Sequence, residues 1–320
     1  MKKTICLFLI LSLFACLFCS CGEENRNRKD NLSVIATIFP EYDWVKEVLG
    51  NNPADAELTL LLDNGVDLHS YQPTAADMVK VAGCDLFIYV GGESDEWVND
   101  ALKEAINPDM IVLDLLDILG SNAVEEETVE GMEPEEEDGE ETEYDEHIWL
   151  SLKNASLFVS AIKDALCKLD PEHKDTYTAN AEQYTEKLNA LDARYLETAK
   201  NASCKTVLFG DRFPFLYLTK DYGLSYYAAF KGCSAESEAS FETVSFLAGK
   251  VDELGLQAIF CLEGSDQRIA TTILSTAKSK DVALLSVDSM QSTTMQDVKN
   301  GVTYLSVMEK NLSALAEGLR

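Results

Sequence analysis

Two of the three histidines in this chain lie in short motifs whose chemistry suits metal binding. His69 lies in the motif GVDLHSYQP (65–73), and His147 lies in DEHIWL (145–150). Neutral imidazole is the usual nitrogen ligand for transition metals such as zinc. The two motifs therefore predict half of a metal site. The remaining histidine, His173, lies in a polar helical pattern and is expected to be a solvated helix residue.

Two aspartates are candidates for the other half of this site. Asp211 and Asp288 each follow an apolar strand pattern in the second half of the chain. Ligands of open α/β sheets bind beyond the carboxyl ends of the strands. A cleft between the two halves is therefore expected to gather His69, His147, Asp211 and Asp288 around one divalent cation. The alternative role for a strand-end aspartate is simply to cap the following helix.

The elements that must position these residues alternate between strand and helix patterns. Short, wholly apolar strands between helices are typical of a parallel sheet covered on both faces. The first half has expected strands at 33–39, 58–61, 85–90 and 110–113, and expected helices at 41–49, 74–81 and 96–105. The second half has expected strands at 205–209, 224–229, 257–261 and 282–287, and expected helices at 214–222, 240–254, 267–279 and 294–319.

Two helical patterns separate the halves. Residues 152–169 are apolar at helical spacing, and Asp170 and Pro171 then start a helix that continues to 200. A helix of roughly 30 residues is about 45 Å long, so this one predicts a stiff strut. The expected organisation is an N-terminal lobe at 33–150, a helical connector at 151–201 with its linking helix at 171–200, and a C-terminal lobe at 202–320.

The N-terminus has the pattern of a secretory signal. A basic start is followed by an apolar run at 5–18, which is shorter than the roughly 20 residues of a spanning helix. A small residue before Cys21 resembles the lipobox of bacterial lipoproteins. We expect a signal peptide at 1–20, lipidation of Cys21, and a flexible tether at 21–32. The alternative is an uncleaved anchor or simple secretion.

The net charge of −30 argues against a nucleic-acid partner, because a phosphate backbone would repel the chain. Residues 125–146 contain fourteen acidic residues and no basic one. Repulsion between these charges predicts a mobile acidic loop at 124–146. Such a loop either concentrates cations weakly or is merely solvated.

The cysteines beyond residue 21 lack the C-x-x-C spacing of zinc knuckles and redox motifs. Cys204 and Cys261 flank predicted strands and are candidates for a disulfide. The alternative is that these side chains are buried free thiols. The five positions are Cys84, Cys167, Cys204, Cys233 and Cys261.

Several motifs together resemble one family, the metal-binding lipoproteins of bacterial ABC importers for zinc and manganese. They are ATIFP (36–40), VDLHSYQP (66–73), DEHIWL (145–150), IFCLE (259–263) and VDS (287–289). The resemblance implies an α/β fold in which two βα lobes, each with a mostly parallel four-stranded sheet, are joined by one long rigid helix. The ion would lie in the cleft between the lobes.

The resemblance also implies a function. The chain would be a monomer, lipid-anchored outside the cytoplasm, that captures Zn²⁺, or alternatively Mn²⁺, and delivers it to a membrane permease with a cytoplasmic ATPase. It would not be an enzyme, and the chain lacks the G-x-x-x-x-G-K-[ST] loop of an ATPase. The alternatives are a metal-dependent hydrolase, which turnover would reveal, and a surface adhesin, which metal-independent binding to host ligands would reveal.

Two positions depart from the family pattern. Glu146 stands where the family usually has proline. Arg212 stands at the position of the third ligand, which is usually His or Glu, and a guanidinium cannot coordinate a metal because it remains protonated. Asp211 is the expected substitute. Glu263 or water are the other candidates for completing the shell.

Overall fold

Each half of the chain folds around a four-stranded parallel sheet. The computed structural model describes residues 31–133, 143–234 and 238–320. In the first sheet the strands lie in the order β2 (Glu57–Leu60), β1 (Ser33–Ala36), β3 (Leu86–Tyr89) and β4 (Ile111–Asp114). In the second sheet the order is β6 (Ser225–Lys231), β5 (Thr206–Phe213), β7 (Ala258–Leu262) and β8 (Ala283–Val287). The predicted α/β fold with two parallel four-stranded sheets is confirmed.

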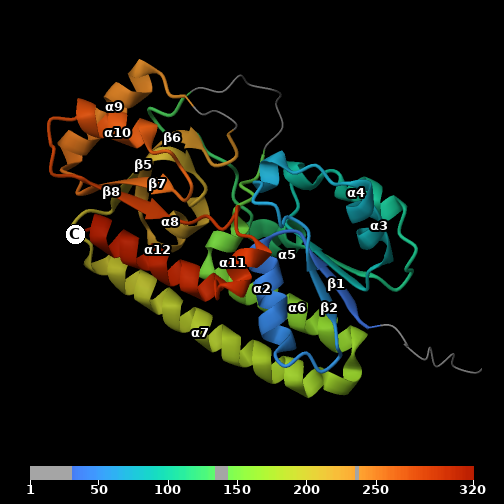
Figure 1. Ribbon diagram of the computed structural model, residues 1–320. Helices are drawn as coiled ribbons and strands as arrows, with labels where there is room; N and C mark the ends of the chain where they lie inside the picture. Colours follow the sequence, from blue (N-terminus) through green and yellow to red (C-terminus); the bar gives the residue numbers. More distant parts are fainter. Residues whose placement is uncertain (1–30, 134–142, 235–237) are drawn as a thin grey trace, which may run out of the picture. The chain divides into compact units, whose positions relative to one another are not determined.

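Helices connect the strands, as Figure 1 shows. The first half contains α2 (Phe39–Leu49), α3 (Ala75–Gly83), α4 (Val98–Lys103) and α5 (Leu115–Leu119). The second half contains α8 (Leu216–Tyr222), α9 (Phe241–Leu254), α10 (Arg268–Thr276), α11 (Met295–Lys299) and α12 (Tyr304–Gly318). Single turns of 3₁₀ helix are η1 (Leu68–Ser70), η2 (Glu93–Asp95), η3 (Gly120–Asn122), η4 (Ile148–Leu150) and η5 (Pro171–His173).

Two long helices, α6 (Leu152–Leu169) and α7 (Lys174–Asn201), join the halves. The amide of Asn180 near the start of α7 donates to the carbonyl of Val48 in α2 over 3.0 Å. Near the other end, the hydroxyl of Tyr195 donates to the carbonyl of Met308 in α12 over 2.6 Å. Helix α7 is therefore bonded to helices of both halves, and Figure 1 shows it running beside α12.

Besides shifts of a few residues at the ends of elements, such as the extension of β5 to Phe213, three differences from the predicted elements have a clear physical reason. The segment predicted as one helix at 294–319 is divided into α11 and α12 because Gly301 adopts φ +94°, a conformation that glycine tolerates best. Phe39 begins α2 rather than ending β1, since Pro40 occupies the first turn, where its missing N–H costs nothing. Helix α5 was not predicted because it has only five residues.

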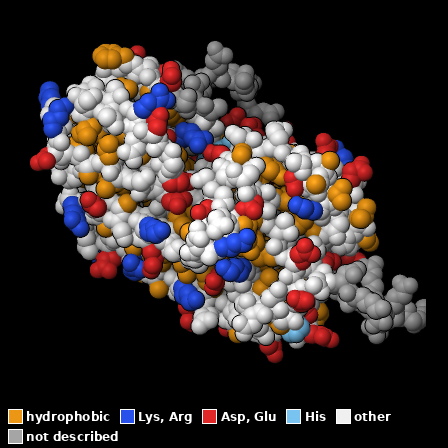
Figure 2. Space-filling model, viewed as in Figure 1, with side chains coloured by type: hydrophobic (Ala, Val, Ile, Leu, Met, Phe, Trp, Pro, Cys, Tyr) orange, Lys and Arg blue, Asp and Glu red, His pale blue; other side chains and the backbone are white. Residues whose placement is uncertain are grey.

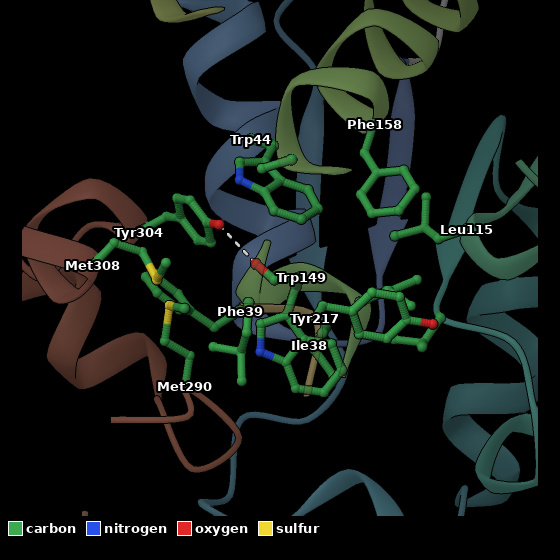
Figure 3. Packing of buried hydrophobic residues seen from close by; sticks show 14 of the residues in the cluster. Ile38, Phe39, Trp44, Leu115, Trp149, Phe158, Tyr217, Met290, Tyr304 and Met308 are labelled. Atoms are coloured by element: carbon green, nitrogen blue, oxygen red, sulfur yellow. Dashed lines mark hydrogen bonds between the residues drawn. The ribbon is translucent and has the colours of Figure 1, made fainter. Parts of the chain in front are cut away.

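A buried core connects the two halves (Figure 3). The indole of Trp149 donates to the carbonyl of Ser289 over 2.8 Å, and its own carbonyl accepts from the hydroxyl of Tyr304 over 2.6 Å. The Tyr304 ring lies edge-on to Trp44, with 5.2 Å between centroids. These contacts fix the segment after His147 against the loop after β8 and against α12, and α12 packs in turn on α2.

The surface carries charges of both signs. On the face that Figure 2 shows, Lys and Arg side chains stand singly or in small groups among acidic ones. None of the helices in the described part of the chain has the length and apolarity needed to cross a bilayer. The predicted signal peptide at 1–20, lipidation of Cys21 and most of the tether lie outside the described residues, as do residues 134–142 of the acidic loop.

Candidate metal centre

His69 is held by the turn that follows β2. It lies in η1, where the Asp67 carboxylate accepts a hydrogen bond from the backbone N–H of His69 over 3.0 Å. The ring Nδ1 lies 2.8 Å from the hydroxyl of Ser94. The side chain is 12% exposed. Backbone and ring are thus both oriented by neighbouring polar groups.

His147 is fully buried at the start of η4. Oδ1 of Asp145 accepts from the His147 backbone N–H over 2.8 Å and lies 3.2 Å from ring Nδ1. An Nδ1–H that donates to Asp145 leaves Nε2 with a free lone pair, as in carboxylate–histidine–metal arrangements. Burial works to lower the pKa of His147, but the Asp145 carboxylate, with smaller contributions from Glu146 and Asp67, raises it on balance.

The imidazole rings of His69 and His147 lie next to one another. Their Nε2 atoms lie 3.2 Å apart, and the ring centroids are separated by 5.1 Å. The amide of Gln291 also reaches this point, with its Nε2 3.2 Å from Nε2 of His147. Two ring nitrogens that face one another can be bridged either by a shared proton or by a metal ion, so the geometry supports the predicted pair of ligands.

The departure from the family pattern at Glu146 has a structural role. Oε1 of Glu146 accepts from the backbone N–H of Ser94 over 2.9 Å. Oε2 is buried, accepts no hydrogen bond among the described residues, and lies 3.4 Å from Nδ1 of His69. Burial works to raise the pKa of Glu146, but His69 and Ser94 hold it below its usual range. A negative charge therefore stands beside the His69 ring.

Asp211 lies within β5, at the irregularity in strand pairing between Phe209 and Arg212, and not after the strand as predicted, because β5 continues to Phe213. Its Oδ2 accepts from the backbone N–H of Leu262 over 3.2 Å, and its Oδ1 accepts from the backbone N–H of Arg212. Among the described residues, no hydrogen bond or ion pair joins Asp211 to either imidazole. The carboxylate links β5 to β7 in this structure.

Asp288 follows β8, as predicted, and lies beside Glu263 at the end of β7. Oδ1 of Asp288 accepts from the backbone N–H of Met290 over 2.8 Å, while Glu263 accepts from both the N–H and the hydroxyl of Ser289. Burial, followed by repulsion from Asp288, raises the pKa of Glu263 to about 7. Burial raises the pKa of Asp288 as well. Within the described part of the chain, no hydrogen bond or ion pair joins Asp288 or Glu263 to His69 or His147.

Two residues that the sequence did not single out lie at the imidazoles. Gln291 follows the VDS motif by two positions, in the same loop. Cys233 follows β6 by two positions, and its sulfur and one ring nitrogen each from His69 and His147 all lie within 4.8 Å of one another. The predicted strand at 224–229 ended too early to mark Cys233 as a strand-end residue. None of the five cysteines from Cys84 onward forms a disulfide.

A pocket of about 260 Å³ opens beside His69 and Cys233. Glutamates from both described ends of the acidic segment line it, including Glu126 and Glu143. These ends pair, since the backbone N–H of Glu126 donates to the carbonyl of Glu143 over 2.9 Å. His173, in contrast, pairs with Asp170 on the connector, over 2.7 Å.

Known proteins resemble the chain over nearly its whole length. The family described as "Zinc-uptake complex component A periplasmic" matches residues 34–318. The zinc-binding lipoprotein AdcA of Streptococcus pneumoniae serotype 4 is 32% identical, over 99% of this chain and 61% of that protein. The chain thus spans about three fifths of that relative's length.

Two further comparisons agree with this match. The high-affinity zinc uptake system protein ZnuA of Bacillus subtilis is 28% identical, over 99% of this chain and 98% of that protein. The crystal structure of the Zn(II)-bound ZnuA-like domain of Streptococcus pneumoniae AdcA matches with a TM-score of 0.71 and 30% identity, over 91% of this chain and 99% of that domain. The chain therefore belongs to the family of zinc-uptake complex component A.

Proposed function

We propose that this chain captures Zn²⁺ outside the cytoplasm and delivers it to an ABC importer. One observation carries the proposal: the Nε2 atoms of His69 and His147 lie 3.2 Å apart, and each ring has a polar partner at Nδ1. Imidazole suits zinc, and an outer partner that accepts from Nδ1–H selects the neutral tautomer whose lone pair is on Nε2. The names of the relatives, which bind or take up zinc, support the same cargo. Manganese is the alternative cargo.

Asp211 and Asp288 remain the proposed oxygen ligands. Each accepts hydrogen bonds from backbone N–H groups. Neither belongs to the group of donor atoms that lie within 4.8 Å of one another, so coordination would require the carboxylate to approach the imidazoles. Glu263, which Ser289 holds on two sides, is the alternative oxygen ligand. Substituting each carboxylate by its amide tests these assignments one at a time.

The wider setting follows from the same proposal. The chain would be a monomer anchored to the bacterial cell membrane through a lipid on Cys21, and its partners would be a membrane permease and a cytoplasmic ATPase. Zinc is cargo in this account, not a cofactor. We assign no catalytic residue and propose that the protein is not an enzyme.

Titration of zinc into metal-free protein tests the proposal. His69→Ala and His147→Ala should each lose high-affinity binding while keeping the fold, as circular dichroism would report. His173→Ala is the matched control, because His173 pairs with Asp170 on the connector. If both site variants bind zinc as the unaltered protein does, the site lies elsewhere.

A further inference from the structure

A sulfur atom lies beside the two imidazoles. One ring nitrogen of His69, one of His147 and the Cys233 sulfur all lie within 4.8 Å of one another. The three residues come from separate segments: η1, the residue before η4, and the loop after β6. Two of the chain's three histidines and one cysteine thus meet at one point. Nitrogen and sulfur donors placed together in this way suit a soft or borderline metal ion.

The backbone brings the cysteine to this point. A Cβ atom on Gly232 would lie 2.9 Å from Cε1 of His147 and 2.9 Å from the carbonyl oxygen of Phe213. Only glycine therefore allows the chain to pass so close to the His147 ring. The next N–H, that of Cys233, donates to Oε1 of Glu126 over 3.1 Å. The backbone is thus fixed up to the residue that carries the thiol.

The other cysteines have different environments. The thiols of Cys84, Cys167 and Cys204 each donate to a backbone carbonyl oxygen. Cys261 is fully buried in the apolar core of the second sheet. None of these four thiols lines the polar pocket beside His69, whereas Cys233 does.

A second observation points to a cation at the same place. Glu146 is 3% exposed, and its buried Oε2 accepts no hydrogen bond among the described residues. This carboxylate lines the same pocket as His69 and Cys233. The polar neighbour of this oxygen is Nδ1 of His69, and their separation of 3.4 Å is longer than a good hydrogen bond. A buried carboxylate oxygen held this weakly costs free energy, and a positive ion bound by the neighbouring donors would offset that cost.

We propose that Cys233 is the third protein ligand of the zinc site, and that its sulfur makes the site selective for zinc over manganese. This proposal rests on the proposed function. On binding, the thiol releases its proton to solvent and the thiolate coordinates the ion. Thiolate ligands favour zinc, while manganese prefers carboxylate and water oxygen. The cysteine would thus bind the ion together with His69 and His147, and an oxygen from Asp211 or Asp288 would complete a four-coordinate shell.

X-ray absorption at the zinc edge of the zinc-loaded protein tests the proposal directly. We expect one sulfur neighbour at about 2.3 Å together with nitrogen neighbours at about 2.0–2.1 Å. In Cys233→Ser the sulfur neighbour should vanish while the nitrogen neighbours remain. Zinc affinity should fall at least about tenfold, since even groups that only orient a ligand are worth that much. Manganese affinity should change little.

Cys167→Ser is the matched control, because that thiol donates to the Lys174 carbonyl on the connector. Its zinc site should keep the sulfur neighbour. Zinc bound by nitrogen and oxygen alone in the unaltered protein would overturn the cysteine assignment and leave the proposed function standing. A protein that binds no zinc would overturn the proposed function, and the cysteine assignment with it.

Discussion

Nη2 of Arg212, in the second half of the chain, lies 2.9 Å from Oδ2 of Asp67 in the first half. The other oxygen of Asp67 accepts from the amide of Gln291 over 3.3 Å and lies 3.9 Å from Nε2 of His69. Burial works to raise the pKa of Asp67, but His69 and Arg212 hold it below its usual range. Arg212 is therefore a fixed positive charge that joins the halves beside the imidazoles.

Removing this charge should tighten cation binding. In Arg212→Gln the guanidinium no longer repels the ion, and the Asp67 carboxylate is left to attract it. The repulsion between two like charges a few ångströms apart in partly buried surroundings is about a few kcal/mol. We therefore expect zinc affinity to rise about tenfold or more. Competition with a chelator measures this, and the gain should shrink with added salt.

Arg194→Gln is the control for that experiment, because Arg194 pairs with Glu309 at an exposed position. It should leave zinc affinity unchanged. Weaker zinc binding in Arg212→Gln would show instead that the bridge to Asp67 is needed to build the site.

Zinc affinity should depend on pH through His147. The ring binds a metal only when neutral, and its pKa is raised above the ordinary value of about 6.5. Affinity should thus be full well above that pKa and fall as pH decreases through it, so that the loss begins above about pH 6.5. Zinc titrations between about pH 8 and pH 5 measure the midpoint.

The variant Asp145→Asn tests whether the Asp145 carboxylate sets the pH at which zinc affinity falls. Without this carboxylate the strongest influence that raises the pKa of His147 is lost, and burial, which lowers it, is opposed only by the weaker effects of Glu146 and Asp67. The midpoint should move to lower pH, while affinity at pH 8 falls about 10–100-fold because the ring loses its orienting partner. An unchanged midpoint would mean that another group controls the pH dependence.

Glu263 should destabilise the metal-free protein at neutral and alkaline pH. Its folded pKa of about 7 exceeds the ordinary value of 4.5, so the folded state binds more protons between these values, and stability falls as pH rises through them. Glu263→Gln removes the charge but also weakens the contacts with Ser289. We expect a net gain of about 1–2 kcal/mol at pH 8.

Urea unfolding at about pH 8 and pH 4 checks this prediction. The gain should be confined to the higher pH, because Glu263 is already neutral at the lower one. Glu182→Gln, at an exposed position of α7, is the control and should change little at either pH. A loss of stability at pH 8 would mean that the Ser289 contacts outweigh the repulsion from Asp288.

Much of the fold could be predicted because its signals are local. Short apolar runs between helical patterns predicted all eight strands in their order, and the Asp170–Pro171 step correctly marked the end of α6. The division of the last helix at Gly301 was missed because a glycine within a helical pattern does not reveal its φ angle. Helix α5 was missed because five residues carry too little periodicity.

The metal centre could be predicted only in part. The His69 and His147 motifs were found because each combines a histidine with a distinctive turn. Gln291 and Cys233 were missed because their approach depends on loop paths: Cys233 reaches the imidazoles only because Gly232 lacks a Cβ atom. The hydrogen bonds of Asp211 and Asp288 to backbone groups likewise depend on tertiary contacts that spacing alone does not encode.

The most direct test of the central claim is the metal content of the purified protein, measured by elemental mass spectrometry with zinc and manganese supplied equally. The unaltered protein should retain about one equivalent of zinc per chain that excess manganese does not displace, and the His69→Ala and His147→Ala variants should lose it. Purified protein without bound zinc, and without the capacity to take it up when zinc is added, would contradict the account.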